Sequence, residues 1–88
     1  MMFRLTGRVA AVDDMVPGEP KHPAMALIIE CNEDLARIVV PPNVWPSAKR
    51  ELLAVDRPVA VTGESDVSPF ALGARAVATS LQLLTSHH

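Results

Sequence analysis

Four cationic side chains and one aromatic ring have the clearest binding chemistry in this 88-residue sequence. They are Lys21, Arg37, Arg75, Arg8 and Phe70. Ammonium and guanidinium groups neutralise phosphates and release counterions, whereas an aromatic ring stacks on a nucleobase of any identity. Because none of these groups reads the edge of a base, together they favour weak, salt-sensitive and sequence-nonspecific binding of a single strand.

Metal binding and catalysis are not indicated by the sequence. The single cysteine, Cys31, and the only interior histidine, His22, lack the spacing of a zinc site. Neither Asp13 nor Asp14 completes a tetrahedral shell with them. The sequence contains no serine–histidine–aspartate set, no glycine-rich phosphate loop and no carboxylate pair in an apolar segment. We therefore expect a protein that is not an enzyme and that uses no metal or other cofactor.

The composition limits the class of partner. Eight basic and ten acidic side chains give a formal net charge of -2, without the basic excess that is usual in nucleic-acid-binding proteins. A local basic patch is compatible with this charge. The single cysteine excludes an internal disulfide, and no run approaches the roughly 18 apolar residues that cross a bilayer. We expect a cytoplasmic protein that does not associate with a membrane.

The pattern of apolar residues predicts five short strands. Alternation and short apolar runs place them at residues 3–12, 25–31, 35–40, 58–66 and 74–84. Pro41 and Pro42 end the third strand, because proline donates no backbone hydrogen bond. Residues 13–23 contain three prolines and a glycine, which predicts a long loop of the kind that often binds ligands.

A short helix is predicted between the third and fourth strands. It should begin near Trp45, because Pro46 is tolerated only in the first turn of a helix. Its apolar stripe would consist of Val44, Ala48, Leu52 and Val55. We expect Trp45 to pack where the helix meets the sheet and Leu52 to cover one end of the structure.

Five strands with one helix between the third and fourth have the connectivity of the OB-fold barrel, an all-β fold. The apolar–threonine–glycine pattern of residues 5–7 recurs at 61–63, and matching bends in two strands favour a closed barrel. Residues 1–85 should form this single domain, followed by a disordered tail or tag remnant at 86–88. The expected core is Leu5, Val9, Leu27, Ile29, Ile38, Val40, Val59, Val61 and Leu81.

Three segments carry a resemblance to a known family. They are residues 36–45, 59–63 and 77–81, which read ARIVVPPNVW, VAVTG and VATSL. From residue 25 to 84 the sequence resembles the OB-fold domain near the C-terminus of bacterial DNA polymerase III alpha subunits, especially their error-prone relatives. The resemblance implies single-stranded DNA binding in replication or repair, without a polymerase active site. The sequence departs from the family at Pro41, where an aromatic residue is frequent.

OB folds bind oligonucleotides across their second and third strands, between the loop joining strands one and two and the loop joining strands four and five. This footprint puts Arg37 at its centre, Lys21 and Phe70 in the flanking loops with Arg75, and Arg8 at the rim. Each has a structural alternative. Arg4 and Arg8 could instead pair with Glu64 across the sheet, and Phe70 could fold over the mouth of the barrel.

Two functions are therefore compatible with the sequence. The first is a nucleic-acid-binding module, and the second is a protein-interaction or homodimerisation module that binds no nucleic acid. The acidic balance, the few aromatic residues and the apolar run at residues 25–29 favour the second, because a strand that is apolar on both faces needs cover on both. A basic groove over the second and third strands would indicate the first function, and an apolar or acidic groove there would indicate the second.

Overall fold

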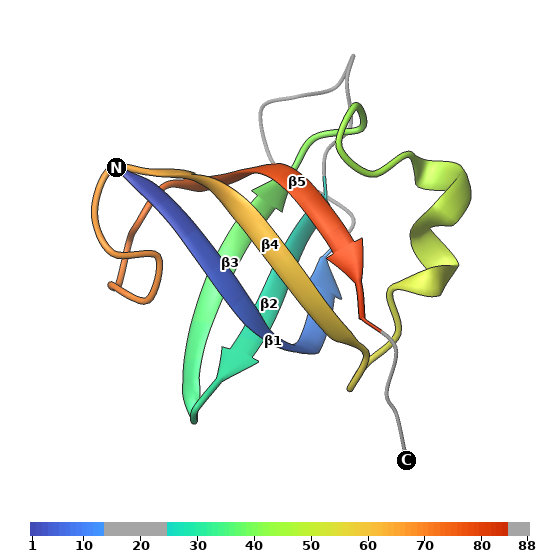
Figure 1. The fold of residues 1–88 in the computed structure, drawn as a ribbon, viewed down its shortest axis with the longest axis horizontal. Coiled ribbons are helices and arrows are strands. Elements are labelled where there is room, and N and C mark those ends of the chain that lie inside the picture. Colours follow the sequence, from blue (N-terminus) through green and yellow to red (C-terminus); the bar gives the residue numbers. More distant parts are fainter. Residues whose placement is uncertain (14–24, 85–88) are drawn as a thin grey trace.

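The computed structural model describes residues 1–13 and 25–84, without the side chains of residues 47, 48 and 50 (Figure 1). Its elements are β1 (Met2–Asp13), β2 (Met25–Cys31), β3 (Asp34–Val40), the 3₁₀ helix η1 (Ser47–Leu52), β4 (Pro58–Ser65) and β5 (Ala76–Leu83). Within the described residues, five strands form a closed barrel in the order β1-β2-β3-β5-β4. The predicted all-β OB-fold barrel is confirmed.

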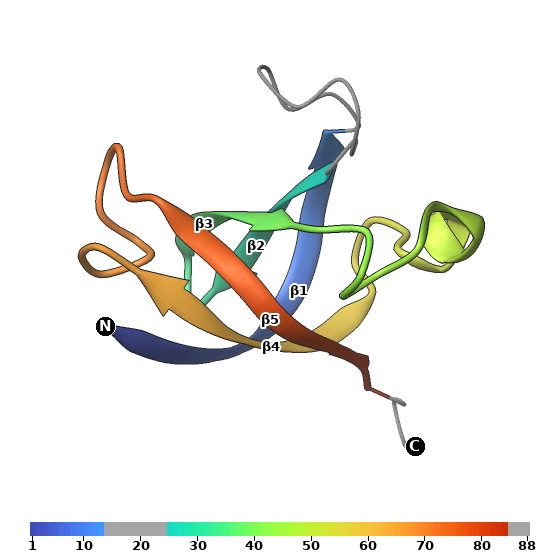
Figure 2. The same ribbon diagram turned by 90° about the horizontal axis from the view of Figure 1, so that it is seen from above.

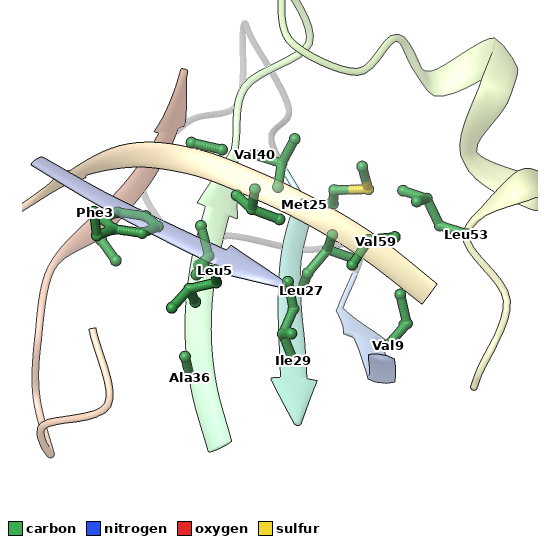
Figure 3. Close-up of a cluster of buried hydrophobic side chains, with 14 residues drawn as sticks. Phe3, Leu5, Val9, Met25, Leu27, Ile29, Ala36, Val40, Leu53 and Val59 are labelled. Atoms are coloured by element: carbon green, nitrogen blue, oxygen red, sulfur yellow. The ribbon is translucent and has the colours of Figure 1, made fainter. Parts of the chain in front are cut away.

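Aliphatic side chains from all five strands fill the barrel (Figure 3). The alternation of β3 is typical, since Ala36, Ile38 and Val40 face inward and are buried while Arg37 faces outward. All predicted core residues are buried except Leu81, which is half-buried against the edge of the core. An irregularity in the register between β4 and β5 at Thr62–Gly63 reverses the alternation of β5 after Ala78, so Leu81 lies opposite the buried Val61 on the side of the core.

A second irregularity lies in β1. Its register with β2 shifts between Val9 and Ala11, so the inward face changes from Val9 to Val12, which packs against the core. An uninterrupted alternation from Phe3 predicts Ala11 on the inner face, but Ala11 is exposed, because an extra residue in a strand reverses its alternation. At this irregularity the backbone of Val9 forms two hydrogen bonds with the segment before β4. Its N–H donates to the carbonyl oxygen of Arg57 at 3.0 Å, and its carbonyl oxygen accepts from the N–H of Asp56 at 2.7 Å.

Two glycines allow the strands of the barrel to approach closely. A Cβ atom at Gly7 would collide with the carbonyl oxygen of Glu30 and lie 2.9 Å from Cγ2 of Ile29. A Cβ atom at Gly63 would collide with the carbonyl oxygen of Val77 and lie 2.8 Å from the ring of Phe3. The glycine repeat in β1 and β4 therefore marks places where a side chain would separate the strands.

The predicted apolar stripe of the helix was wrong at Leu52 and Val55, whereas Val44 packs against the core. Leu52 is 48% exposed and Val55 is 63% exposed, whereas Leu53, at 4%, covers that end of the barrel. The helix is a 3₁₀ helix that begins at Ser47 and ends at Leu52, so Leu53 directly follows it and Val55 lies beyond its end. Trp45 packs against the core, as predicted, and its indole Nε1 donates to the carbonyl oxygen of Lys49 at 2.9 Å.

The turn between β2 and β3 has a backbone with positive φ angles. Asn32 and Glu33 join β2 to β3 with φ angles of 51° and 73°, as in the tight turns that suit antiparallel strands. The predicted loop at residues 13–23 lies outside the described residues except for Asp13, which ends β1, and so does the tail at 86–88. No helix in the described part of the chain is long and apolar enough to span a membrane.

Replacing Ile38 with Ala should lower the free energy of unfolding by about 2–5 kcal/mol, because it removes a fully buried side chain from the centre of the barrel. Urea denaturation measures the effect. Val77→Ala is the matched control: Val77 is 41% exposed on the neighbouring strand, so its loss should cost less than about 1 kcal/mol. Equal effects of the two substitutions would contradict the inward orientation of Ile38.

Candidate functional site

An open pocket of about 590 Å³ lies between the outer face of β2 and β3 and the loop that joins β4 to β5. Figures 1 and 2 show this loop, in orange, projecting from the barrel. The described residues that line the pocket are Ile28, Leu35, Arg37, Pro69, Phe70, Ala71, Leu72, Gly73, Ala74 and Arg75. Most of them are apolar, and the two charged residues are both arginines.

The parallel pairing of β3 with β5 determines the location of the pocket. It consists of Ile38 opposite Ala76 and Val39 opposite Val77. Because the two strands run in the same direction, the residues that precede Ile38 and Ala76 lie at the same end of the paired segment. Arg37 and Arg75 therefore come to the same pocket from positions that are distant in the sequence.

Two strands form the wall of the pocket opposite the loop. Ile28 of β2 and Arg37 of β3 are opposite each other in the antiparallel register, and both point away from the core. Ile28 is half-buried, whereas Leu35 is 56% exposed. The apolar run of β2 therefore has two roles, since its inward residues fill the core and Ile28 forms apolar lining of the pocket.

The carboxylate of Asp66 ties the two ends of the loop together. Its Oδ1 accepts hydrogen bonds from the backbone N–H of Val67 at 2.9 Å and of Arg75 at 2.8 Å. The pKa of Asp66 is lowered, chiefly by the hydrogen bond from the Arg75 amide and to a smaller extent by the Arg75 guanidinium. A lowered pKa means that this stabilisation is present above the pKa of the unfolded chain and is lost as the pH falls through that of the folded state.

Two turns give the loop its internal shape. The N–H of Ala71 donates to the carbonyl oxygen of Ser68 at 2.9 Å, and the N–H of Ala74 donates to that of Ala71 at 3.1 Å. Gly73 has a φ of 77°, the positive value that the third position of a type II turn requires. Leu72, which precedes it, is fully exposed at the apex. An ordered loop thus presents an apolar side chain at the pocket.

Phe70 contacts both the core and the pocket. It is half-buried and packs against the core cluster, and it also lines the pocket. Its backbone N–H donates to Oγ of Ser68 at 3.4 Å. The two expectations for this ring, as cover for the barrel mouth and as a stacking surface, are therefore compatible.

Of the other candidate cations, only Arg8 lies in the described part of the chain. Arg8 is exposed on β1, opposite Glu30 of β2 and Pro58 of β4, and is not among the lining residues. In the same register Arg4 is opposite Thr62, while Glu64 is opposite Met2. Lys21 lies outside the described residues. The described pocket therefore contains Arg37, Arg75 and Phe70 from the predicted set.

Sequence reasoning missed Asp66 and Leu72. The signal for Asp66 was present, because an aspartate followed by a serine–proline pair and a glycine is typical of a turn that a side chain stabilises. Nothing in the local pattern indicates that Leu72 is exposed. Among the described residues, no group of three or more His, Cys, Asp or Glu side chains is arranged to hold a metal ion.

Comparisons with known proteins agree on the fold. The chain matches no protein-family model and no curated protein sequence. Among solved structures it is similar to the S. pombe Stn1–Ten1 complex, with a TM-score of 0.70 and 20% identity over 97% of this chain and 59% of that chain. It is also similar to the Pyrococcus horikoshii asparaginyl-tRNA synthetase complexed with asparaginyl-adenylate, with a TM-score of 0.69 and 21% identity over 98% of this chain.

The lengths of these neighbours differ from that of the chain. This chain spans 59% of the Stn1–Ten1 chain and 19% of the synthetase chain. The N-terminal domain of PriB from Thermoanaerobacter tencongensis, a dimeric structure, has a TM-score of 0.65 and 15% identity, and the alignment covers 97% of both chains. At these identities the similarity establishes the barrel fold.

Replacing Gly73 with Ala should destabilise the loop by about 1–2 kcal/mol, because the positive φ is unfavourable for a residue with a Cβ atom. The position is sterically open, since beyond its two chain neighbours no atom would lie within 4 Å of a Cβ atom there. Gly73→Asn is the control, because asparagine tolerates this region better than alanine. Amide hydrogen exchange across residues 66–75 measures the change. Equal exchange in the two variants would contradict a backbone requirement at Gly73.

Proposed function

We propose that this protein is a nucleic-acid-binding module that binds single-stranded DNA weakly and without sequence preference. The observation that supports the proposal most strongly is that Arg37, Arg75 and Phe70 line one pocket. The pocket occupies the surface that OB folds use for oligonucleotides, beside strands two and three and under the loop between strands four and five. The two arginines among the described lining residues support a nucleic-acid site despite the net charge of -2.

The pocket has suitable groups for both parts of a nucleotide. The ring of Phe70 and the apolar side chains of Leu35 and Leu72 provide surface for a base, and stacking on an aromatic ring contributes about 1–3 kcal/mol per base. The guanidiniums of Arg37 and Arg75 are exposed and can bind the flanking phosphates. Phosphate contacts position a strand without reading its sequence, so binding by this set should be nonspecific.

A binding role, rather than an enzymatic one, agrees with the chemistry of the pocket. Its described lining residues include no carboxylate, histidine, cysteine or hydroxyl side chain that could act as a base or nucleophile. The resemblance of residues 25–84 to the OB-fold domain of DNA polymerase III alpha subunits supports a role in DNA replication or repair.

Fluorescence anisotropy with labelled oligo-dT tests the proposal. Binding should be detectable at low salt and should weaken as salt rises. If two phosphates are neutralised, the slope of log K against log salt should be about -1.4, because each phosphate of a single strand contributes about -0.7. Oligo-dA and oligo-dC should bind with similar affinity. The absence of binding to any of them at low salt would overturn the proposal.

Arg37→Glu should weaken oligo-dT binding by more than about tenfold, because it replaces a phosphate-binding cation with an anion at the pocket. The melting temperature should change little, since Arg37 is exposed. Arg4→Glu is the matched control, with the same charge change on an exposed residue of β1 that does not line the pocket. Comparable losses in the two variants would indicate a general charge effect and contradict a site at Arg37.

A protein-interaction or homodimerisation module is the second candidate function. It is favoured by the full exposure of Leu72 beside Leu35, which is 56% exposed, because adjacent exposed apolar side chains are typical of protein interfaces. Native mass spectrometry distinguishes the two candidates. A dimer that is disrupted by Leu72→Ser, together with no binding to oligo-dT, would support this second function.

A further inference from the structure

The carboxylate of Asp66 joins the two ends of the loop over the pocket. Asp66 directly follows β4, and Arg75 directly precedes β5. The hydrogen bond of 2.8 Å from the Arg75 amide to Oδ1 of Asp66 spans nine positions of the sequence. The same oxygen also accepts the N–H of Val67 at 2.9 Å. This carboxylate latch, defined as Asp66 with the two amides, fixes where the loop leaves the barrel and where it returns.

The latch acts on residues that line the pocket, although Asp66 itself does not line it. The backbone N–H of Arg75 donates to Asp66, while the side chain of Arg75 lines the pocket. The hydrogen bond therefore holds the backbone from which that guanidinium extends. Phe70 and Leu72 lie within the segment that the latch closes. A loop that is ordered before binding avoids the cost of ordering on binding, which raises affinity.

We infer that Asp66 is a positioning residue for the ligand site: its carboxylate holds the β4–β5 loop in the conformation in which Arg75 and Phe70 face Arg37. This inference rests on the proposed binding of single-stranded nucleic acid. It assigns Asp66 no contact with the ligand. Asp66 acts through the two hydrogen bonds that it accepts from the backbone amides of Val67 and Arg75.

The sign of the effect separates positioning from simple electrostatics. Asp66 is an acidic residue near a site that is proposed to bind an anionic strand. If only its charge mattered, replacing it with Ala would tighten binding, because a repulsive charge is removed. If the latch positions the site, the same substitution weakens binding. We expect Asp66→Ala to weaken oligo-dT binding by about fivefold, since the loop must then be ordered on binding.

Two further variants complete the test. Asp66→Asn removes the charge but keeps an oxygen acceptor in the same position, so it should bind oligo-dT as tightly as the wild-type protein or more tightly. Glu64→Ala removes the same charge from an exposed residue of β4, two positions earlier. It should also leave binding unchanged or tighter. Equal or tighter binding by Asp66→Ala than by Glu64→Ala would overturn the inference.

Amide hydrogen exchange provides a readout that does not depend on the ligand. In Asp66→Ala, the amides of Val67 and Arg75 should exchange faster than in Asp66→Asn, while the amide of Ile38 in the barrel should be unaffected. Unchanged exchange at Arg75 would overturn the latch. If the wild-type protein does not bind oligo-dT, the proposed function fails and the positioning role fails with it, whereas the exchange data still decide whether Asp66 holds the loop. If Asp66→Ala does not fold, weaker binding by Asp66→Asn despite a native melting temperature would overturn the inference.

Discussion

The parallel pairing of β3 with β5 closes the barrel through Ile38 opposite Ala76 and Val39 opposite Val77. All other strand pairs are antiparallel and longer. The closure buries Ile38 and Ala76 in the core and aligns the chain before β5 with the first half of β3. The candidate site is a consequence of this alignment, because Arg37 and Arg75 immediately precede the paired residues. A shift of this register would change both the residues that line the pocket and the packing of the core.

The loop between β4 and β5 shows how a short chain can present polar and apolar groups in a defined arrangement. Only Pro69 is buried in the segment from Asp66 to Arg75, and backbone hydrogen bonds and one carboxylate order the rest. Pro69 is buried and Phe70 packs against the core, so the loop is attached to the barrel at its middle as well as at its ends. Leu72, at the apex, is left fully exposed. Ordering of this kind lowers the entropy that a ligand would otherwise remove.

Net charge and local charge give different indications for this protein. The whole chain has a formal charge of -2, yet the described charged residues that line the pocket are both arginines. Exposed acidic residues also lie next to the lining, since Asp34 directly precedes Leu35 and Glu30 is opposite it in the register of β2 with β3. The repulsion of an anionic ligand by exposed carboxylates weakens as salt rises.

The sequence alone determined the number and order of the strands and most of the core, because alternation with a period of two, glycines and prolines act locally. It also predicted that Arg37 points outward, since Ala36 and Ile38 on either side are apolar. Only the tertiary structure decided the positions of Ala11, Leu53 and Leu81, because the irregular registers depend on neighbouring strands and Leu53 packs on the barrel from beyond the end of the helix. The meeting of Arg37 with Arg75 was likewise decided by the closure of the barrel. Contacts between distant segments arise from strand pairing, and a local pattern contains no information about which residues will be paired.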